Sequence, residues 1–167
     1  MGKYDENGVD KKVKIVKEEC PMCHEIGEMV KNITVKHLVL EKFVEEVSNE
    51  ESYYLCMNEN CNVVYYSLDN KSIFNKKKIK VPIWFKKDAN PKYICYCNKV
   101  TEEQIINAVV NQGAKNIKDI NRLTGAMENG NCILNNPLGK CCGPNILETI
   151  RKAISDNNNI KIYNKRV

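Results

Sequence analysis

The spacing of the cysteines constrains this chain more than any other feature of its sequence. Nine cysteines occur in 167 residues. They are Cys20, Cys23, Cys56, Cys61, Cys95, Cys97, Cys132, Cys141 and Cys142. An odd number excludes complete internal disulfide pairing, and proteins of the reducing cytosol rarely contain disulfides. Close pairs of cysteines separated by long intervals are instead typical of metal ligation.

The charges divide the chain into two parts. Residues 1–90 hold 15 basic and 15 acidic side chains, whereas residues 91–167 hold 11 and 6 and so carry the whole net charge of +5. A lysine-rich run at 76–80 followed by Pro91 marks a connector between the two parts. We therefore expect a first unit at 1–90, a second unit at 91–155 and a loose tail at 156–167.

The first unit is expected to be rich in β-strands. Three segments, 32–40, 52–55 and 63–67, are dominated by β-branched and aromatic residues. The last two flank the second pair of cysteines. Residues 41–47 fit either a short helix or the continuation of a strand, and the sequence leaves both alternatives open.

The second unit is expected to be helical, which makes the fold class α+β. Thr101 and Gln104 form a capping box, and apolar residues follow at helical spacing up to Gly113. Another helix is predicted over 116–125, between an asparagine that can cap its start and a glycine that can end it. Pro144 suits the first turn of a third helix.

Two close pairs of cysteines lie in the first unit. Each tight turn can place two sulfurs on one side of the backbone, as a tetrahedral zinc ion requires. Strands that flank such pairs are typical of a zinc ribbon, and a small unit with few large aliphatic residues gains stability from a metal. The sequence therefore predicts a zinc-ribbon-like unit with a structural zinc ion. Its predicted ligands are Cys20, Cys23, Cys56 and Cys61.

Other roles for residues of this group are less well supported. Cys20 and Cys23 could form a thioredoxin-like redox pair, but the βαβ context of that motif is missing. Met22 suggests soft Cu(I) ligation, although a methionine in such a turn more often only packs. His24 could replace one thiolate, but four cysteines are already available. His37 is expected to be an ordinary strand residue.

The second group of cysteines has a different pattern. Cys95 and Cys97 are separated by one residue, and a long helical stretch precedes Cys132 and the adjacent Cys141 and Cys142. Four thiolates from three loops suit a [2Fe–2S] cluster, in which two close sulfurs can hold one iron and two distant sulfurs the other. Spacing alone does not choose between Cys141 and Cys142.

The surroundings of the last two cysteines suit a negatively charged group. Because a helix is predicted to begin near Pro144, its free N–H groups and positive dipole end would face the cluster. Gly139 and Gly143 let the backbone approach closely. The net positive charge of this unit either offsets the cluster charge, attracts an acidic partner or is only a solvated basic surface.

These residues resemble a known family. Residues 93–148 are similar to the [2Fe–2S] domain of the bacterioferritin-associated ferredoxin (BFD) type, and residues 20–148 more closely resemble the N-terminal part of the archaeal CopZ-type copper chaperones. The features that carry the resemblance are Cys20-Pro21-x-Cys23, Thr34-Val35-Lys36-His37-Leu38, Tyr53-Tyr54-x-Cys56, Cys61-x-Val63-Val64-Tyr65, Cys95-Tyr96-Cys97 and Asn136-Pro137-x-Gly139-Lys140-Cys141-Cys142.

The resemblance implies one zinc ion and one [2Fe–2S] cluster. The cluster ligands that it implies are Cys95, Cys97, Cys132 and Cys142. Cys141 would then be a spare thiol. The zinc positions that it implies are Cys20, Cys23, Cys56 and Cys61.

Two features depart from the family pattern. The 167 residues do not include the C-terminal heavy-metal-associated domain with its G-M-x-C-x-x-C copper motif, so we do not expect these residues to deliver copper by that route. Gly130 stands where family members often have a cysteine. This substitution lowers the expected capacity for soft metals.

The expected function is that of an iron–sulfur and zinc-binding protein that carries one electron. The resemblance links it to copper or other metal homeostasis and implies reduction of Cu(II). One alternative is a Cu(I)-binding module that passes metal to a partner, such as a copper-transport or redox protein. Another is a nucleic-acid-binding zinc ribbon that uses the lysines at 76–80.

The composition argues against several other classes of protein. No catalytic triad or carboxylate pair supports a conventional enzyme. No apolar run is long enough to span a membrane, and the first six residues show no secretory signal. We therefore expect a cytoplasmic protein.

Overall fold

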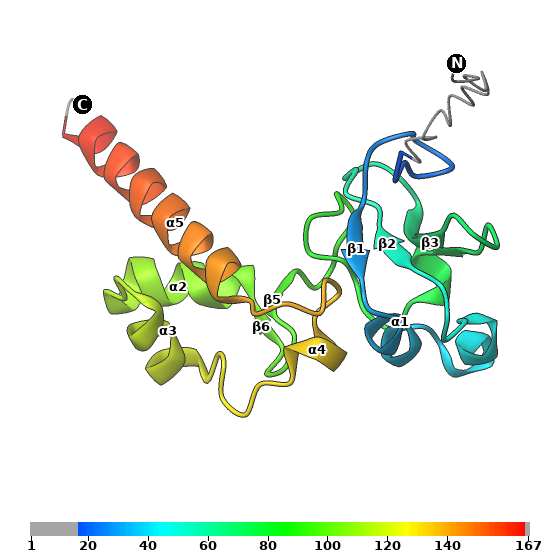
Figure 1. Cartoon of the computed structure of the whole chain (residues 1–167). Coiled ribbons are helices and arrows are strands. Elements are labelled where there is room, and N and C mark those ends of the chain that lie inside the picture. The colour runs from blue at the N-terminus through cyan, green and yellow to red at the C-terminus, as the bar shows by residue number, and fades with distance from the viewer. Residues whose placement is uncertain (1–16, 166–167) are drawn as a thin grey trace, which may run out of the picture.

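A computed structural model describes residues 17–165 as two packed units (Figure 1). The first unit contains a four-stranded antiparallel sheet and the second is mostly helical, which confirms the α+β class. The elements of the first unit are β1 (Glu28–Val30), α1 (Asn32–Leu38), η1 (Glu41–Glu46), β2 (Tyr53–Leu55), β3 (Val63–Ser67), β4 (Ile73–Asn75) and η2 (Lys76–Lys78). Those of the second unit are β5 (Tyr93–Cys95), β6 (Val100–Thr101), α2 (Glu102–Gln112), α3 (Ile117–Thr124), α4 (Cys132–Asn135) and α5 (Gly143–Asn164).

The sheet of the first unit separates two different cores. Its strands follow the order β1-β2-β3-β4, and every residue of β2 and β3 is buried, so both faces are covered. Because side chains alternate along a strand, Tyr53 and Tyr65 enter an apolar core on one face. Tyr54 and Tyr66 lie on the other face, in a cluster that includes the first four cysteines.

The predicted strand over 32–40 is wrong, because most of this segment forms helix α1. Its buried side chains lie on one face, and Thr34 donates a hydrogen bond from Oγ1 to the carbonyl oxygen of Ile133 at 2.6 Å. This packing of α1 against α4 outweighs the strand preference of its β-branched residues.

The structure also decides two predictions for residues in and beside α1. His37 lies in the last turn of this helix and is therefore not a strand residue. Of the two alternatives for 41–47, the short helix is observed, as the 3₁₀ helix η1. Between them, the backbone N–H of Leu40 donates to the carbonyl oxygen of Lys78 at 2.8 Å and ties this segment to η2.

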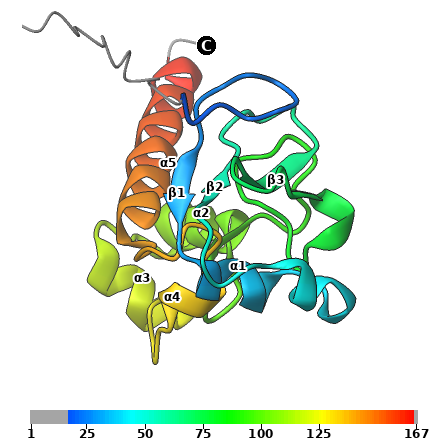
Figure 2. The same cartoon turned by 45° about the vertical axis from the view of Figure 1, so that its right-hand side comes forward.

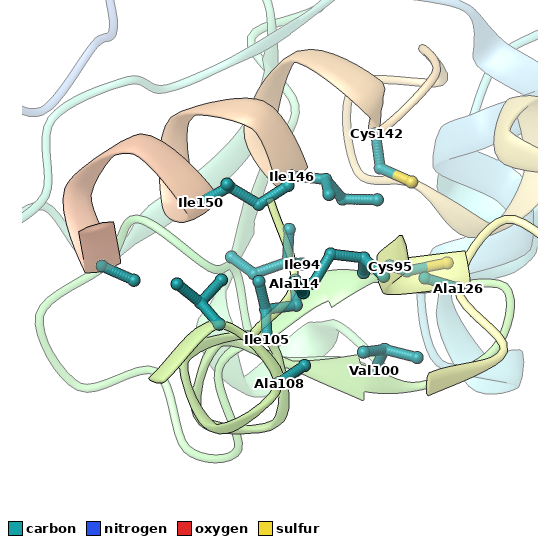
Figure 3. Close-up of a cluster of buried hydrophobic side chains, with 13 residues drawn as sticks. Ile94, Cys95, Val100, Ile105, Ala108, Ala114, Ala126, Cys142, Ile146 and Ile150 are labelled. Carbon is teal, nitrogen blue, oxygen red and sulfur yellow. The ribbon is translucent and has the colours of Figure 1, made fainter. Parts of the chain in front are cut away.

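The helix signals of the second unit are confirmed. Thr101 and Gln104 form both hydrogen bonds of the capping box at the start of α2, and Gly113 ends this helix in the left-handed conformation. The side chain of Asn116 caps α3. Helices α2, α3 and α5 enclose one core with β5 and β6 (Figure 3). Its buried members include Ile94, Val100, Ile105, Ala108, Ile120, Ile146 and Ile150.

Helix α5 is longer than predicted. The tail that was expected to be loose from residue 156 is helical through Asn164. The asparagines at 157–159 favour helix only weakly, which is why the sequence indicated a loose tail. However, no glycine or proline follows the first turn of α5, and Ile160 lines a groove together with apolar side chains of α2. Extension of an existing helix is much easier than its nucleation, so the helix continues.

Buried polar contacts join the two units, which lie side by side in Figure 2. The hydroxyl of Tyr65 donates to the carbonyl oxygen of Pro137 at 2.6 Å. The hydroxyl of Tyr96 donates to the carbonyl oxygen of Pro82 at 2.6 Å and accepts from the backbone N–H of Trp84 at 3.0 Å. The Trp84 side chain packs against the cores of both units. The connector is therefore part of the packed structure.

Removal of the Tyr65 hydroxyl tests this junction. Tyr65→Phe leaves the buried carbonyl of Pro137 without a partner, so we expect the free energy of unfolding to fall by about 1–3 kcal/mol. Chemical denaturation followed by circular dichroism measures the change. Tyr163→Phe is the matched control, because Tyr163 is 70% exposed and its hydroxyl is already solvated. Equal stability of the two variants would contradict the role of this hydrogen bond.

Candidate metal centres

Four thiols converge on one face of the sheet. The Sγ atoms of Cys20, Cys23, Cys56 and Cys61 all lie within 4.8 Å of one another. Cys20 Sγ is 4.0 Å from Cys61 Sγ, and Cys23 Sγ is 3.6 Å from Cys56 Sγ. Thiolates bound to a tetrahedral zinc ion at about 2.3 Å lie about 3.8 Å apart, whereas a disulfide needs about 2.05 Å. The geometry and the donor set therefore fit zinc.

Two tight turns position these thiols. In the first turn, the backbone N–H of Cys20 donates to Glu25 O at 2.8 Å and that of His24 to Cys20 O at 2.9 Å, while His24 adopts a φ of 62°. In the second turn, Asn58 Oδ1 accepts from the backbone N–H groups of Asn60 and Cys61 at 2.8 and 3.1 Å. Each turn thus closes on itself and presents its two sulfurs to the same point.

Neither of the other residues weighed for this site joins the four thiols. The side chain of His24 is exposed and lies outside the group. Met22 is 65% exposed, so most of its side chain is in solvent and it does not pack in the turn. The four cysteines by themselves supply a complete tetrahedral donor set.

Burial and hydrogen bonding act in opposite directions on these thiols. Burial raises the pKa of Cys20 and of Cys56. Burial also acts to raise the pKa of Cys23, but hydrogen bonds from the backbone at Glu25 and from the neighbouring thiols lower it overall. Zinc binds thiolates, so binding must release protons from the buried members of the group.

The second group forms two pairs of thiols that are close in space and distant in sequence. Cys97 Sγ lies 3.9 Å from Cys132 Sγ. A hydrogen bond from the Cys142 thiol lowers the pKa of Cys95 to about 5 and raises the pKa of Cys142 far above its usual range. In Figure 3 the sulfurs of Cys95 and Cys142 are seen at the same end of the core. Each pair combines one cysteine of the Cys95-Tyr96-Cys97 segment with one from farther along the chain.

Amide groups surround the Cys95 and Cys97 sulfurs. The backbone N–H of Met127 and the Nδ2 group of Asn98 donate to Cys95 Sγ at 3.4 and 3.8 Å. The backbone N–H of Asn131 and the Nδ2 group of Asn135 donate to Cys97 Sγ at 3.1 and 3.6 Å. Such N–H donors stabilise negative sulfur, and together with four thiols they fit a [2Fe–2S] cluster.

The sequence did not indicate these amide donors. Backbone N–H groups have no sequence signature. Asn98 directly follows Cys97 in the sequence, but the direction of its side chain, like the approach of Asn135 from α4, depends on the fold. The compositional bias toward asparagine also hides the two that are used.

The adjacent Cys141 and Cys142 have opposite environments. Cys142 is 1% exposed and packs in the core of the second unit. Cys141 is exposed, and its Sγ accepts a hydrogen bond from the backbone N–H of Gly143 at 3.4 Å. Cys142 directly precedes α5, and its thiol is hydrogen-bonded to that of Cys95, whereas Cys141 belongs to neither thiol group.

Two lysines of the run at 76–80 are held in ion pairs. Lys76 pairs with Asp88 at 2.6 Å and Lys78 with Glu46 at 3.1 Å. The aromatic side chains of β2 and β3 beside the zinc-site cysteines are buried. Two lysines of the run are therefore already paired within the protein, and the aromatic side chains of β2 and β3 are not available for stacking on bases.

Comparison with known proteins identifies two adjoining metal-binding domains. Residues 17–80 match the CopZ-type zinc binding domain, and residues 93–152 match the BFD-like [2Fe-2S] binding domain. The class defined by fold and sites is therefore a zinc-binding domain joined to a [2Fe–2S]-binding domain. No helix in residues 17–165 is long and apolar enough to cross a membrane.

The chain belongs to the family of the CopZ N-terminal domain. It is 33% identical over 123 residues to the copper chaperone CopZ of Archaeoglobus fulgidus, and the match covers 74% of this chain and 57% of that protein. The X-ray structure of the A. fulgidus CopZ N-terminal domain matches with a TM-score of 0.65 and 32% identity, and covers 78% of this chain and 95% of that one. The chain thus spans less than two thirds of the length of this curated relative.

If the two centres are separate, loss of a ligand from one thiol group should leave the metal of the other group in place. Cys56→Ser removes a thiolate from the first group, so we expect the protein to lose zinc and to keep its iron and sulfide. Cys132→Ser should have the opposite effect, because Cys132 lies in the second group. Metal and sulfide analysis of anaerobically purified protein measures both. Loss of both metals from either variant, with the fold intact by circular dichroism, would contradict two separate centres.

Proposed function

We propose that this chain holds one structural zinc ion and one [2Fe–2S] cluster and carries single electrons in copper homeostasis. The proposed zinc ligands are Cys20, Cys23, Cys56 and Cys61. The proposed cluster ligands are Cys95, Cys97, Cys132 and Cys142. The domain boundary near residue 90 separates the two sets.

One observation carries this proposal: both thiol groups occur in a single fold that is similar over 123 residues to a copper chaperone. The pairing of thiols supports the cluster ligands, because each iron of a [2Fe–2S] cluster takes two cysteines. Cys97 and Cys132 form one close pair and Cys95 and Cys142 the other. Cys141, which is exposed and outside both pairs, is left as the spare thiol.

The two pairs differ in their access to solvent. Cys95 and Cys142 are buried, whereas Cys97 and Cys132 are half-buried. A bound cluster supplies one-electron transfer, for which Cu(II) is the proposed substrate. The half-buried pair forms the edge that a copper ion or a redox partner protein can approach, and the buried pair excludes water from the opposite side.

The amide donors have a defined role in this proposal. Reduction adds a negative charge, and N–H groups directed at Cys95 and Cys97 stabilise that charge, which raises the reduction potential. Zinc has no redox chemistry of its own, so the first unit acts as a scaffold. Cysteines that serve as metal ligands rather than as disulfides are typical of a reducing compartment, and we propose the cytoplasm.

The adjacent cysteines provide the sharpest test of the cluster ligands. Cys142→Ser should abolish the visible absorption of the cluster, because the core-facing thiolate is lost. Cys141→Ser is the matched control and should retain that absorption, since its thiol faces solvent. The iron-to-protein ratio and the visible spectrum of both variants are the measurements. Equal loss in both, or loss only at Cys141, would overturn the assignment.

Reduction of Cu(II) tests the proposed activity. Protein reduced by dithionite and freed of excess reductant should regain its oxidised visible spectrum on addition of Cu(II), with about one Cu(I) formed per cluster. A Cu(I)-specific chromophoric chelator and the visible spectrum follow the two products. A reduced cluster that persists in the presence of Cu(II) would reject the activity.

Dialysis of the copper-treated protein against the same chelator tests the alternative of a Cu(I)-binding module. Exposure of the Cys141 thiol is the observation that favours this alternative. Copper that stays on wild-type protein during dialysis against the chelator, and leaves Cys141→Ser, would indicate a copper-binding role. Copper that leaves both proteins supports electron transfer alone.

A further inference from the structure

A buried lysine lies in the connector between the two units. Lys86 is 3% exposed, which is rare for lysine unless its ammonium group is paired. Within residues 17–165 no carboxylate lies within ion-pairing distance of it, and the nearby Asp88 is bound to Lys76 at 2.6 Å. The charge of Lys86 must therefore be balanced by other groups.

The hydrogen bonds of Lys86 lead to the zinc-site cysteines. Its Nζ donates to the carbonyl oxygen of Asn58 at 2.6 Å and to that of Val63 at 3.1 Å. Asn58 forms the turn between Cys56 and Cys61, and Val63 follows that turn. The ammonium group thus bridges both sides of the loop that presents these two thiols.

An aromatic ring is the other neighbour of the Lys86 ammonium group. The Nζ atom lies 5.4 Å from the centroid of the Phe85 ring. The direct partners of this buried cation are therefore two backbone carbonyls and one aromatic ring, none of which carries a full negative charge.

A zinc ion held by four thiolates leaves two uncompensated negative charges. Three of the four cysteines are buried, so water screens this charge poorly. A cation fixed beside the site stabilises it most effectively when hydrogen bonds hold it in place. Among the residues described, Lys86 is a buried lysine with this placement, and it lies outside the stretch 17–80 that matches the zinc binding domain.

We propose that Lys86 is a positioning residue of the zinc site: its ammonium group offsets the charge of the four-thiolate centre and holds the loop between Cys56 and Cys61. This inference rests on the proposed zinc ligands. It makes the connector a functional part of the first unit, because the segment that joins the two units also completes the environment of the metal.

Replacement of Lys86 by a neutral side chain tests the proposal. Lys86→Met keeps the length of the side chain and removes the charge, and we expect zinc affinity to fall about 10- to 100-fold, as for loss of other groups that support a metal ligand. Lys87→Met is the matched control, because Lys87 is exposed and pairs only at the surface with Glu59 at 3.4 Å. Competition with a chromophoric zinc chelator measures the affinities of full-length protein.

A second variant separates charge from hydrogen bonding. Lys86→Gln can still donate to a carbonyl but is neutral, so we expect it to bind zinc as weakly as Lys86→Met. In the Co(II)-substituted protein, the thiolate-to-cobalt absorption of both variants should move to longer wavelength, because loss of the cation raises the energy of the sulfur electrons. Wild-type affinity and an unshifted band in Lys86→Gln would overturn the proposal, whatever the folding of Lys86→Met.

The outcomes distinguish this inference from the proposed function. Absence of zinc from wild-type protein would reject the zinc ligands themselves. Zinc bound equally tightly by the wild type, Lys86→Met and Lys86→Gln would leave the ligands intact and reject only the role of Lys86. The visible absorption of the second unit and circular dichroism report whether each variant is folded.

Discussion

The convergence of four thiols on one face of a short-stranded sheet is the constraint on which the first unit depends. Ionised thiols within 4.8 Å of one another repel strongly in a buried site. A zinc ion converts this repulsion into bonding, and its binding energy then becomes folding energy. Strands β1, β2 and β4 have only three residues each, so strand pairing alone gives the sheet little stability. The metal and the buried tyrosines on both faces of the sheet supply the remainder.

The second unit depends on the connector as well as on its own helices. Trp84 packs against both cores, and two residues farther along the chain Lys86 enters the surroundings of the first thiol group. Tyr65 of the sheet reaches Pro137 in the loop that leads to Cys142. Packing and hydrogen bonds therefore connect the two metal-binding regions, although no residue belongs to both thiol groups.

Features that depend on neighbouring residues were predictable from the sequence. The capping box at Thr101, the left-handed glycines that end α2 and α3, and the two turns of the first thiol group each require only a few consecutive residues. The strand predicted over 32–40 was wrong because contacts with the distant helix α4 decide that segment. The prediction of a loose tail after residue 156 was wrong because continuation of α5 outweighs the weak helix preference of asparagine.

The sequence by itself indicated the division of the cysteines into two groups and a mostly helical second unit, because cysteine spacing, helix caps and apolar periodicity are properties of short stretches of chain. Only the tertiary structure decided which thiols face one another, since Cys97 meets Cys132 and Cys95 meets Cys142 across a long helical stretch. It also placed Cys142 in the core and Cys141 at the surface. These choices follow from how helices and loops pack, a property that the spacing of residues along the chain does not contain.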